Sequence, residues 1–215
     1  MSQVYWALQT KVTECSQILD LTEVKKFRTY TFIYSQEKKL ERWLHKMKKV
    51  QRYFLDFEFS KNYKAQIIQS KNLLKIVLND RKNYEINKFF YKQIGKDHFW
   101  RDRLVWTDKQ WLKYSSSPFL ETWILKDEKN DLIGYYEIEK HDNKEFELIN
   151  MGILSEHRSK GYGSLLLNHV LKKSFDNKAN KVWVHTCSLD HKFALANYLS
   201  RGFKIFKKEQ IDFVA

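Results

Sequence analysis

Cysteine, proline and long apolar runs are scarce in this sequence. The two cysteines, Cys15 and Cys187, lie in surroundings typical of neither a disulfide framework nor a cysteine metal cluster, which indicates a reducing cytoplasmic setting. No apolar run approaches the roughly 20 residues of a membrane-spanning helix. The N-terminus also lacks the basic and apolar regions of a secretory signal. We therefore expect a soluble cytoplasmic protein with no membrane association.

The composition is that of a globular protein. Hydrophobic residues make up 43% of the 215 positions and aromatic residues 16%, which is too apolar for a disordered chain. A chain of this length forms one well-cored domain, or a smaller domain with an attached module. There is no internal repeat or low-complexity tract, and the single proline, Pro118, punctuates one loop.

Positive charge is concentrated in the first part of the chain. The formal net charge is +13, and residues 1–82 contain 17 Lys or Arg against 8 Asp or Glu, whereas residues 83–215 contain 22 against 18. Solvated lysine-rich faces are the simpler explanation, and a surface for an acidic partner such as nucleic acid is the alternative. We expect that nucleic acid is not a partner.

Residues 1–70 are expected to form a small α+β extension. Aromatic and β-branched residues predict strands at 28–34 and 53–59. Between them, helical spacing predicts a helix capped by Ser35 with an apolar stripe of Leu40, Trp43, Leu44, Met47, Val50 and Phe54. The stripe faces away from the basic side, so we expect it to pack against the main sheet and not to stack nucleic-acid bases.

The remaining residues alternate between strand and helix patterns. Strands are predicted at 73–78, 119–125, 132–139, 146–154, 182–186 and 203–206. Helices are predicted at 83–93, 164–175 and 190–200, with a further short helix capped by Thr107 or Asp108. This order indicates a mixed α/β fold of the α+β type.

The most informative stretch runs from an apolar strand through a basic, glycine-bearing turn into an amphipathic helix. Gly161 and Gly163 can adopt positive φ and carry no Cβ, so backbone N–H groups can converge on an anion at the start of the helix. Leu166 stands where a dinucleotide-binding motif has its third glycine, and no Gly-Lys-Ser/Thr follows as in a P-loop. The pattern therefore predicts a phosphate cradle of another kind.

The segment Arg158-Ser-Lys-Gly-Tyr-Gly163 resembles the Arg/Gln-x-x-Gly-x-Gly/Ala motif of the GNAT superfamily of acetyl-coenzyme A-dependent N-acetyltransferases. A second motif of that family, Ala-x-x-x-Tyr-x-x-x-Gly-Phe, is matched by Ala194, Tyr198, Gly202 and Phe203. The resemblance extends from about Leu73 to Phe206. It implies a central, twisted, mostly antiparallel sheet flanked by helices, in a domain spanning residues 71–215.

The resemblance also implies acetyl-coenzyme A as the acetyl donor, with no metal. Its pantetheine arm is expected to lie along the backbone of Ile153 and Leu154. Its pyrophosphate is expected on the turn formed by Arg158, Ser159, Lys160, Gly161, Tyr162, Gly163 and Ser164. His191 stands where many family members carry Asn, and we expect it beside the pantetheine arm.

Two residues are candidates for acid and base catalysis. Tyr198 matches the family tyrosine that protonates the coenzyme A sulfur, and a buried tyrosine bonded to a carbonyl is the alternative. Glu147 matches the glutamate of the family's histone-acetylating branch. Strand alternation predicts that it shares a face with Ile149 and Met151, where partial desolvation would raise its pKa. An ion-paired edge residue, or Glu137 or Glu139 as the base, stays open.

Other residues near the motifs have simpler expected roles. The spacing of His185, Asp190 and His191 does not predict a metal site, and Asp190 is expected to be a helix N-cap. Cys187 is expected to be a packed residue and not an acyl carrier. Trp100 and Trp106 lie where the family's first helices wall the acceptor site, so they are candidates for substrate binding.

These patterns predict an N-acetyltransferase that transfers an acetyl group from acetyl-coenzyme A directly to a primary amine. The acceptor, the length of the acyl group and a homodimeric state stay open. One alternative is a catalytically inactive acyl-coenzyme A-binding module of the same fold. The other is a basic nucleic-acid-associated protein.

Overall fold

The computed structural model describes residues 35, 36, 38, 47–64 and 74–214. By contacts the chain divides into two units, Met1–Lys49 with Asp212–Ala215, and Val50–Ile211. The second unit contains every element discussed below as part of the site. The strand predicted at 28–34 and the domain boundary predicted at residue 70 lie outside the described residues.

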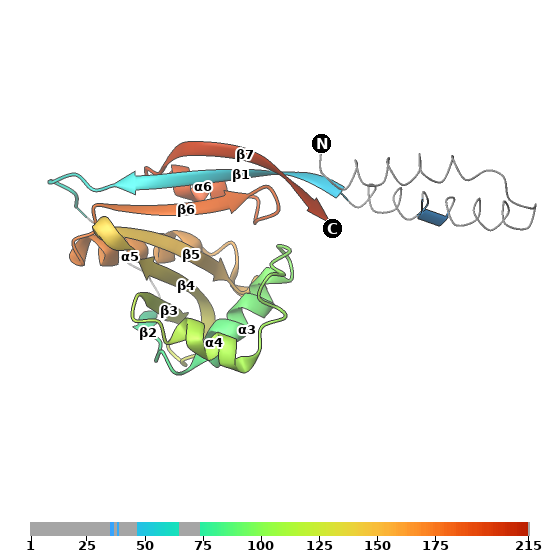
Figure 1. Cartoon of the computed structure of the whole chain (residues 1–215). Helices are drawn as coiled ribbons and strands as arrows, with labels where there is room; N and C mark the ends of the chain where they lie inside the picture. The colour runs from blue at the N-terminus through green and yellow to red at the C-terminus, as the bar shows by residue number, and fades with distance from the viewer. Residues whose placement is uncertain (1–34, 37, 39–46, 65–73, 215) are drawn as a thin grey trace, which may run out of the picture. The chain divides into compact units, whose positions relative to one another are not determined.

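A seven-stranded sheet forms the centre of the fold, with the order β2-β3-β4-β5-β6-β1-β7 (Figure 1). The strands β2, β3, β4 and β5 pair antiparallel in succession, β6 pairs antiparallel with β1, and β5 pairs parallel with β6. The predicted mixed α/β fold with a mostly antiparallel sheet is therefore confirmed. The strands span β1 Met47–Glu58, β2 Lys75–Leu78, β3 Leu120–Lys126, β4 Leu132–Lys140, β5 Glu145–Ile153, β6 Lys181–Cys187 and β7 Lys204–Val214.

Strand β1 contradicts part of the N-terminal prediction. The helical stripe was expected to continue through Val50 and Phe54, but the chain is a strand from Met47 onward. The β-favouring residues of this segment pair with β6 from Arg52 opposite Cys187 to Glu58 opposite Lys181, and Leu55 is fully buried in the core. Burial and pairing with a distant strand outweigh an apolar spacing that also fits a helix.

Helices cover the sheet on both faces (Figure 1). On one face, α3 (Tyr84–Gly95) buries Phe90 and Ile94 against Ile124 and Tyr135, beside α4 (Asp108–Ser115). The other face carries α5 (Tyr162–Asp176) and α6 (Ala194–Leu199), with short 3-10 turns at Asp142–Lys144 and Ser155–His157 elsewhere. Within the described part of the chain, every helix is too short or too polar to cross a lipid bilayer.

Local signals at two helix starts had different outcomes. The predicted cap of α4 is confirmed, because the Thr107 side chain accepts from the Gln110 N–H in a capping box. The predicted cap at Asp190 is wrong, because α6 begins at Ala194 and its N-cap residue is Phe193. Asp190 instead accepts hydrogen bonds from Thr186 Oγ1 at 2.8 Å and from the Cys187 N–H at 2.9 Å. It therefore closes the turn after β6.

A β-bulge in β5 changes the face on which the candidate base lies. Ile138 pairs with Leu148 but Glu137 pairs with Asn150, so Ile149 is the extra residue. The predicted common face of Glu147 and Met151 is therefore wrong. Glu147 lies on the α3 and α4 face, whereas Met151 packs into the core beneath α5.

Candidate active site

Strands β5 and β6 separate after a short parallel ladder (Figure 1). They pair only from Glu145 opposite Lys181 to Glu147 opposite Trp183, although β5 continues to Ile153 and β6 to Cys187. Beyond Glu147, β5 pairs with β4 on its outer edge and β6 pairs with β1 on its outer edge, but the two strands no longer pair with each other. The inner edge of β5 after Glu147 is thus the place where an extended ligand could hydrogen-bond to a strand.

The predicted pantetheine positions already have bonds within the chain. The Leu154 N–H donates to the Ile133 carbonyl at 2.9 Å, and the Ile153 carbonyl accepts from Arg158 Nε at 3.2 Å. A carbonyl has two lone pairs, so the second contact leaves capacity for a further donor. Contact of both residues with pantetheine stays a prediction.

The turn after β5 has the backbone conformation that an anion cradle needs. Gly161 lies in the left-handed region with φ +79°, and a Cβ built on it would meet no atom within 4 Å. A Cβ on Gly163 would come no closer than 3.7 Å to Asn197 Nδ2. At the start of α5, the N–H groups of Ser164 and Leu165 donate to the Gly161 carbonyl. The Gly163 N–H comes before them in the chain, among the first N–H groups of the helix, which have no partner within it. These glycines leave room for a ligand at the positive end of α5.

The side chains of this turn have different surroundings. Ser159 and Lys160 are exposed, whereas Tyr162 packs against the core. Arg158 donates to Asp97 Oδ2 at 3.0 Å as well as to Ile153, so it ties the turn to the segment after α3. Ser164 Oγ donates to Asn197 Oδ1 at 3.1 Å, which joins the start of α5 to α6. The turn is therefore held from two sides, and contact of these side chains with phosphate stays a prediction.

Tyr198 is a buried residue of α6. Its ring packs edge-on against Phe203 with centroids 5.7 Å apart, and its hydroxyl hydrogen-bonds to nothing in the described part of the chain. Burial, with a smaller contribution from the negative charge of Asp190, raises the pKa of Tyr198 well above its usual range. The phenol therefore stays protonated at neutral pH, as a proton donor must.

His191 and Trp100 lie near the turn that Asp190 closes. The His191 ring contacts His98 with centroids 6.1 Å apart, and burial followed by the charge of Arg158 lowers its pKa. Trp100 Nε1 donates to Asp190 Oδ1 at 3.4 Å. The structure thus brings the segment after α3 next to the end of β6, as a wall of the acceptor site requires.

Glu147 lies at the point where β5 and β6 separate. Its carboxylate is mostly buried, with 14% of the side chain exposed, and hydrogen-bonds to His141 Nε2 at 3.1 Å. Burial raises the pKa of Glu147, the hydrogen bond from His141 opposes the rise, and the nearby Glu139 carboxylate adds to it. Its position suits a proton acceptor beside the separated strands.

A buried polar cluster around Glu137 was not predicted. This fully buried carboxylate accepts hydrogen bonds from four side chains on the same face: Asn87 at 2.6 Å, Asn150 at 2.7 Å, Tyr114 at 2.8 Å and Arg103 at 3.4 Å. These four donors compensate the burial of its charge. The only sequence signal was a glutamate between the apolar residues Tyr136 and Ile138.

Trp106 contacts this cluster through Arg103. The guanidinium lies over the Trp106 ring at 5.1 Å and over the Tyr114 ring at 4.3 Å. Trp106 therefore packs against a cation of the protein itself. Two buried atoms of the cluster, Tyr135 Oη and Asn87 Oδ1, have no hydrogen-bond partner in the described part of the chain. The cluster retains unused hydrogen-bonding capacity next to the candidate acceptor wall.

His185, Asp190 and His191, whose spacing did not predict a shared metal site, have different partners in the structure. Asp190 bonds to Thr186 and Cys187, and His191 contacts His98, whereas His185 Nδ1 lies 4.0 Å from Glu147 Oε1. Burial raises the pKa of the Cys187 thiol, which disfavours the thiolate that an acyl carrier needs.

Comparisons with known proteins agree with this geometry. The model of a family described as "Acetyltransferase (GNAT) family" matches residues 82–203, more than half of the chain. No curated protein sequence matches this chain.

Solved structures show the same fold. A GCN5-related N-acetyltransferase from Sphaerobacter thermophilus is 12% identical, with a TM-score of 0.61 over 83% of this chain and 55% of that one. One from Kribbella flavida is 13% identical, with a TM-score of 0.53 over 77% and 58%. An aminoglycoside acetyltransferase from an uncultured soil metagenomic sample is 13% identical, with a TM-score of 0.53 over 61% and 89%. The chain spans about half the length of the first two.

Proposed function

The chain belongs to the GNAT family of acetyltransferases, and from that premise we propose that it transfers an acetyl group from acetyl-coenzyme A directly to a primary amine. The observation that carries the proposal is the separation of β5 and β6 beside the Gly161 turn. There the edge of β5 that faces β6 lies next to the glycine turn. The strand edge suits the amide-containing arm of coenzyme A, and the turn suits its pyrophosphate.

The donor is held mainly by backbone in this proposal. N–H groups at the start of α5 bind the pyrophosphate, and the exposed Lys160 adds positive charge. The inner edge of β5 near Ile153 and Leu154 pairs with the pantetheine arm, and His191 lies beside it. Arg158 and Ser164 hold the turn in place through their bonds to Asp97 and Asn197.

The chemistry needs one proton acceptor and one proton donor. Glu147, directly or through a water molecule, takes a proton from the amine as its nitrogen attacks the thioester carbonyl carbon. When the carbon–sulfur bond breaks, Tyr198 donates a proton to the departing thiolate. The products are an acetylated amine and free coenzyme A, and solvent returns each side chain to its starting state.

The acceptor lies between the segment after α3 and the edge of β5. Trp100 and Trp106 form its apolar wall, and the Glu137 cluster lies on the same face. This arrangement supports an acceptor with an apolar part next to its amino group.

A screen for free-thiol release tests the proposal. Purified full-length protein is mixed with acetyl-coenzyme A and a panel of small amines, amino acids, aminoglycosides and peptides. Amine-dependent thiol release, with the acetylated product identified by mass spectrometry, is the expected result. Coenzyme A binding without turnover on any amine would instead support the inactive module. Binding of RNA with steep salt dependence, and none of coenzyme A, would support the nucleic-acid alternative.

The base is tested with a matched pair of variants. Glu147→Gln removes the proposed acceptor of the proton, and we expect it to lower kcat by a factor on the order of 10²–10⁴. Glu139→Gln changes the neighbouring carboxylate in the same way and should cause a much smaller loss. If the larger loss belongs to Glu139, the base is assigned to the wrong strand.

A further inference from the structure

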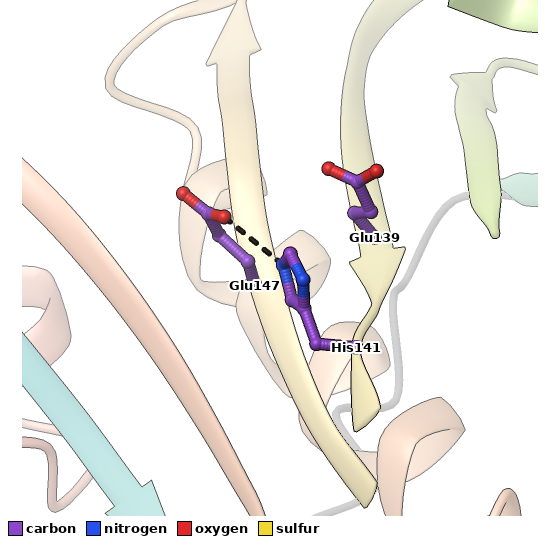
Figure 2. Close-up of side chains that lie close together, drawn as sticks. All are labelled: Glu139, His141 and Glu147. Atoms are coloured by element: carbon purple, nitrogen blue, oxygen red, sulfur yellow. Dashed lines mark hydrogen bonds and ion pairs between the residues drawn. The ribbon is translucent and has the colours of Figure 1, made fainter. Parts of the chain in front are cut away.

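Three metal-ligating side chains meet at the hairpin that joins β4 to β5 (Figure 2). Glu139 and Glu147 lie opposite each other in the β4–β5 ladder, and His141 follows two residues after Glu139. The His141 N–H donates to the Glu145 carbonyl at 2.8 Å, which extends the hairpin beyond β4. One donor atom from each of the three side chains lies within 4.8 Å of the other two. From this geometry we propose that Glu139, His141 and Glu147 form a site for a divalent cation of the zinc class.

The electrostatics of the three residues favour a cation. Two carboxylates directly opposite each other on neighbouring strands repel. Glu147 has the hydrogen bond from His141, but in the described part of the chain the Glu139 carboxylate has no hydrogen bond or ion pair. Both glutamates are at least partly buried, so solvent screens their repulsion less than on an open surface. A divalent cation between them would remove this repulsion.

The donor atoms select the kind of cation. Two carboxylate oxygens and an imidazole nitrogen suit Zn²⁺, Co²⁺ or Ni²⁺, whereas Mg²⁺ and Ca²⁺ prefer six or more oxygen ligands. His185 Nδ1, 4.0 Å from Glu147 Oε1, can supply a fourth ligand from β6. Bonds of about 2.0 Å place tetrahedral zinc ligands about 3.3 Å apart. The side chains therefore have to move inward by about an ångström, and the exposed His141 can do so by rotation.

The site has a consequence for acyl transfer, which rests on the proposed function. A cation bound to Glu147 neutralises its carboxylate and makes it a weaker acceptor for the proton of the amine. Cation binding therefore opposes base catalysis at Glu147, and Zn²⁺ is expected to inhibit the enzyme.

Binding is measured on chelator-treated full-length protein without acetyl-coenzyme A or amine. We expect calorimetry to show one Zn²⁺ per chain and no binding of Mg²⁺, and Co²⁺ to give the intense visible absorption of a tetrahedral site. Glu139→Gln and His141→Gln should each weaken Zn²⁺ binding at least about tenfold. His157→Gln, which removes a histidine outside the cluster, should not change it.

Two binding results would overturn the site. One is the absence of Zn²⁺ binding to correctly folded protein, and the other is the same affinity in both cluster variants as in the wild type. Neither result would affect the proposed acyl transfer, because no step of it uses the metal. In the activity assay, Zn²⁺ should inhibit the wild type at concentrations at least about tenfold lower than it inhibits Glu139→Gln. Equal inhibition of the two proteins would also contradict the site.

Discussion

The half-buried His169 of α5 should make the fold sensitive to mild acid. Its Nδ1 hydrogen-bonds with the Tyr136 hydroxyl at 2.8 Å, and its ring lies edge-on to Trp123 with centroids 5.0 Å apart. Burial, followed by the positive charges of Lys173 and Lys172, lowers its pKa to about 4 from 6.5. In the folded state the imidazole therefore stays neutral at pH values where it is protonated in the unfolded chain.

The sign and size of the effect follow from proton linkage. Between pH 6.5 and 4 the unfolded state binds more protons, so the free energy of unfolding falls as the pH falls in this window. From pH 7.5 to pH 5 the full effect of such a shift is about 2 kcal/mol. Partial exposure of the ring reduces it, and we expect about 1–2 kcal/mol.

Urea unfolding at pH 7.5 and at pH 5 measures this loss in the wild type and in His169→Gln. Glutamine keeps a hydrogen-bond acceptor for Tyr136 but does not titrate. The other histidines and carboxylates contribute equally to both proteins, so the difference between the two losses isolates His169. If the variant loses as much stability as the wild type, the imidazole does not titrate with a depressed pKa and the explanation is wrong.

Three further predictions concern the donor site, the acid and β1. Gly161→Val should weaken coenzyme A binding measured by calorimetry by at least about tenfold, because a β-branched residue strains positive φ and fills the cradle. Asn130→Val, which strains a positive φ in the turn between β3 and β4, should leave the affinity unchanged; equal loss in both variants would contradict the cradle. Tyr198→Phe should keep coenzyme A affinity and lower kcat on the order of 10²-fold, and a wild-type rate would exclude it as the acid. Deletion of residues 1–70 removes β1 from between β6 and β7 and should prevent cooperative thermal unfolding, whereas deletion of 1–46 should preserve it; a folded 71–215 fragment would contradict this account.

Most elements could be predicted because their signals are local. The Thr107 capping box, the apolar alternation of the central strands and the glycines of the Gly161 turn depend on residues close together in sequence. The family motifs added the order of the elements. Together they were enough to predict the fold class, whereas the position of the donor site stays a prediction.

Apart from the Asp190 cap, the errors involve contacts between distant residues. Nothing near Val50 and Phe54 reveals that β6 is a pairing partner, and the bulge at Ile149 results from the fit of β5 to β4. Glu137 acquires its donors from α3, α4, β5 and the segment between the two helices. The cation cluster was missed for a related reason, since it needs the hairpin pairing of β4 with β5.

The position of β1 sets a constraint on biosynthesis. On the ribosome, β1 emerges early, but its neighbours β6 and β7 are made last, and the Gln51 N–H bonds to a Ser188 side chain 137 positions away. At a translation rate of about 5–20 residues per second, this strand waits on the order of ten seconds for its partner. During that time an aromatic, β-forming segment has no place in a sheet, and it can pair with the same segment of another nascent chain. Cells that produce this protein therefore have to keep β1 from pairing with other chains until translation ends. A chaperone bound to the nascent strand would do so.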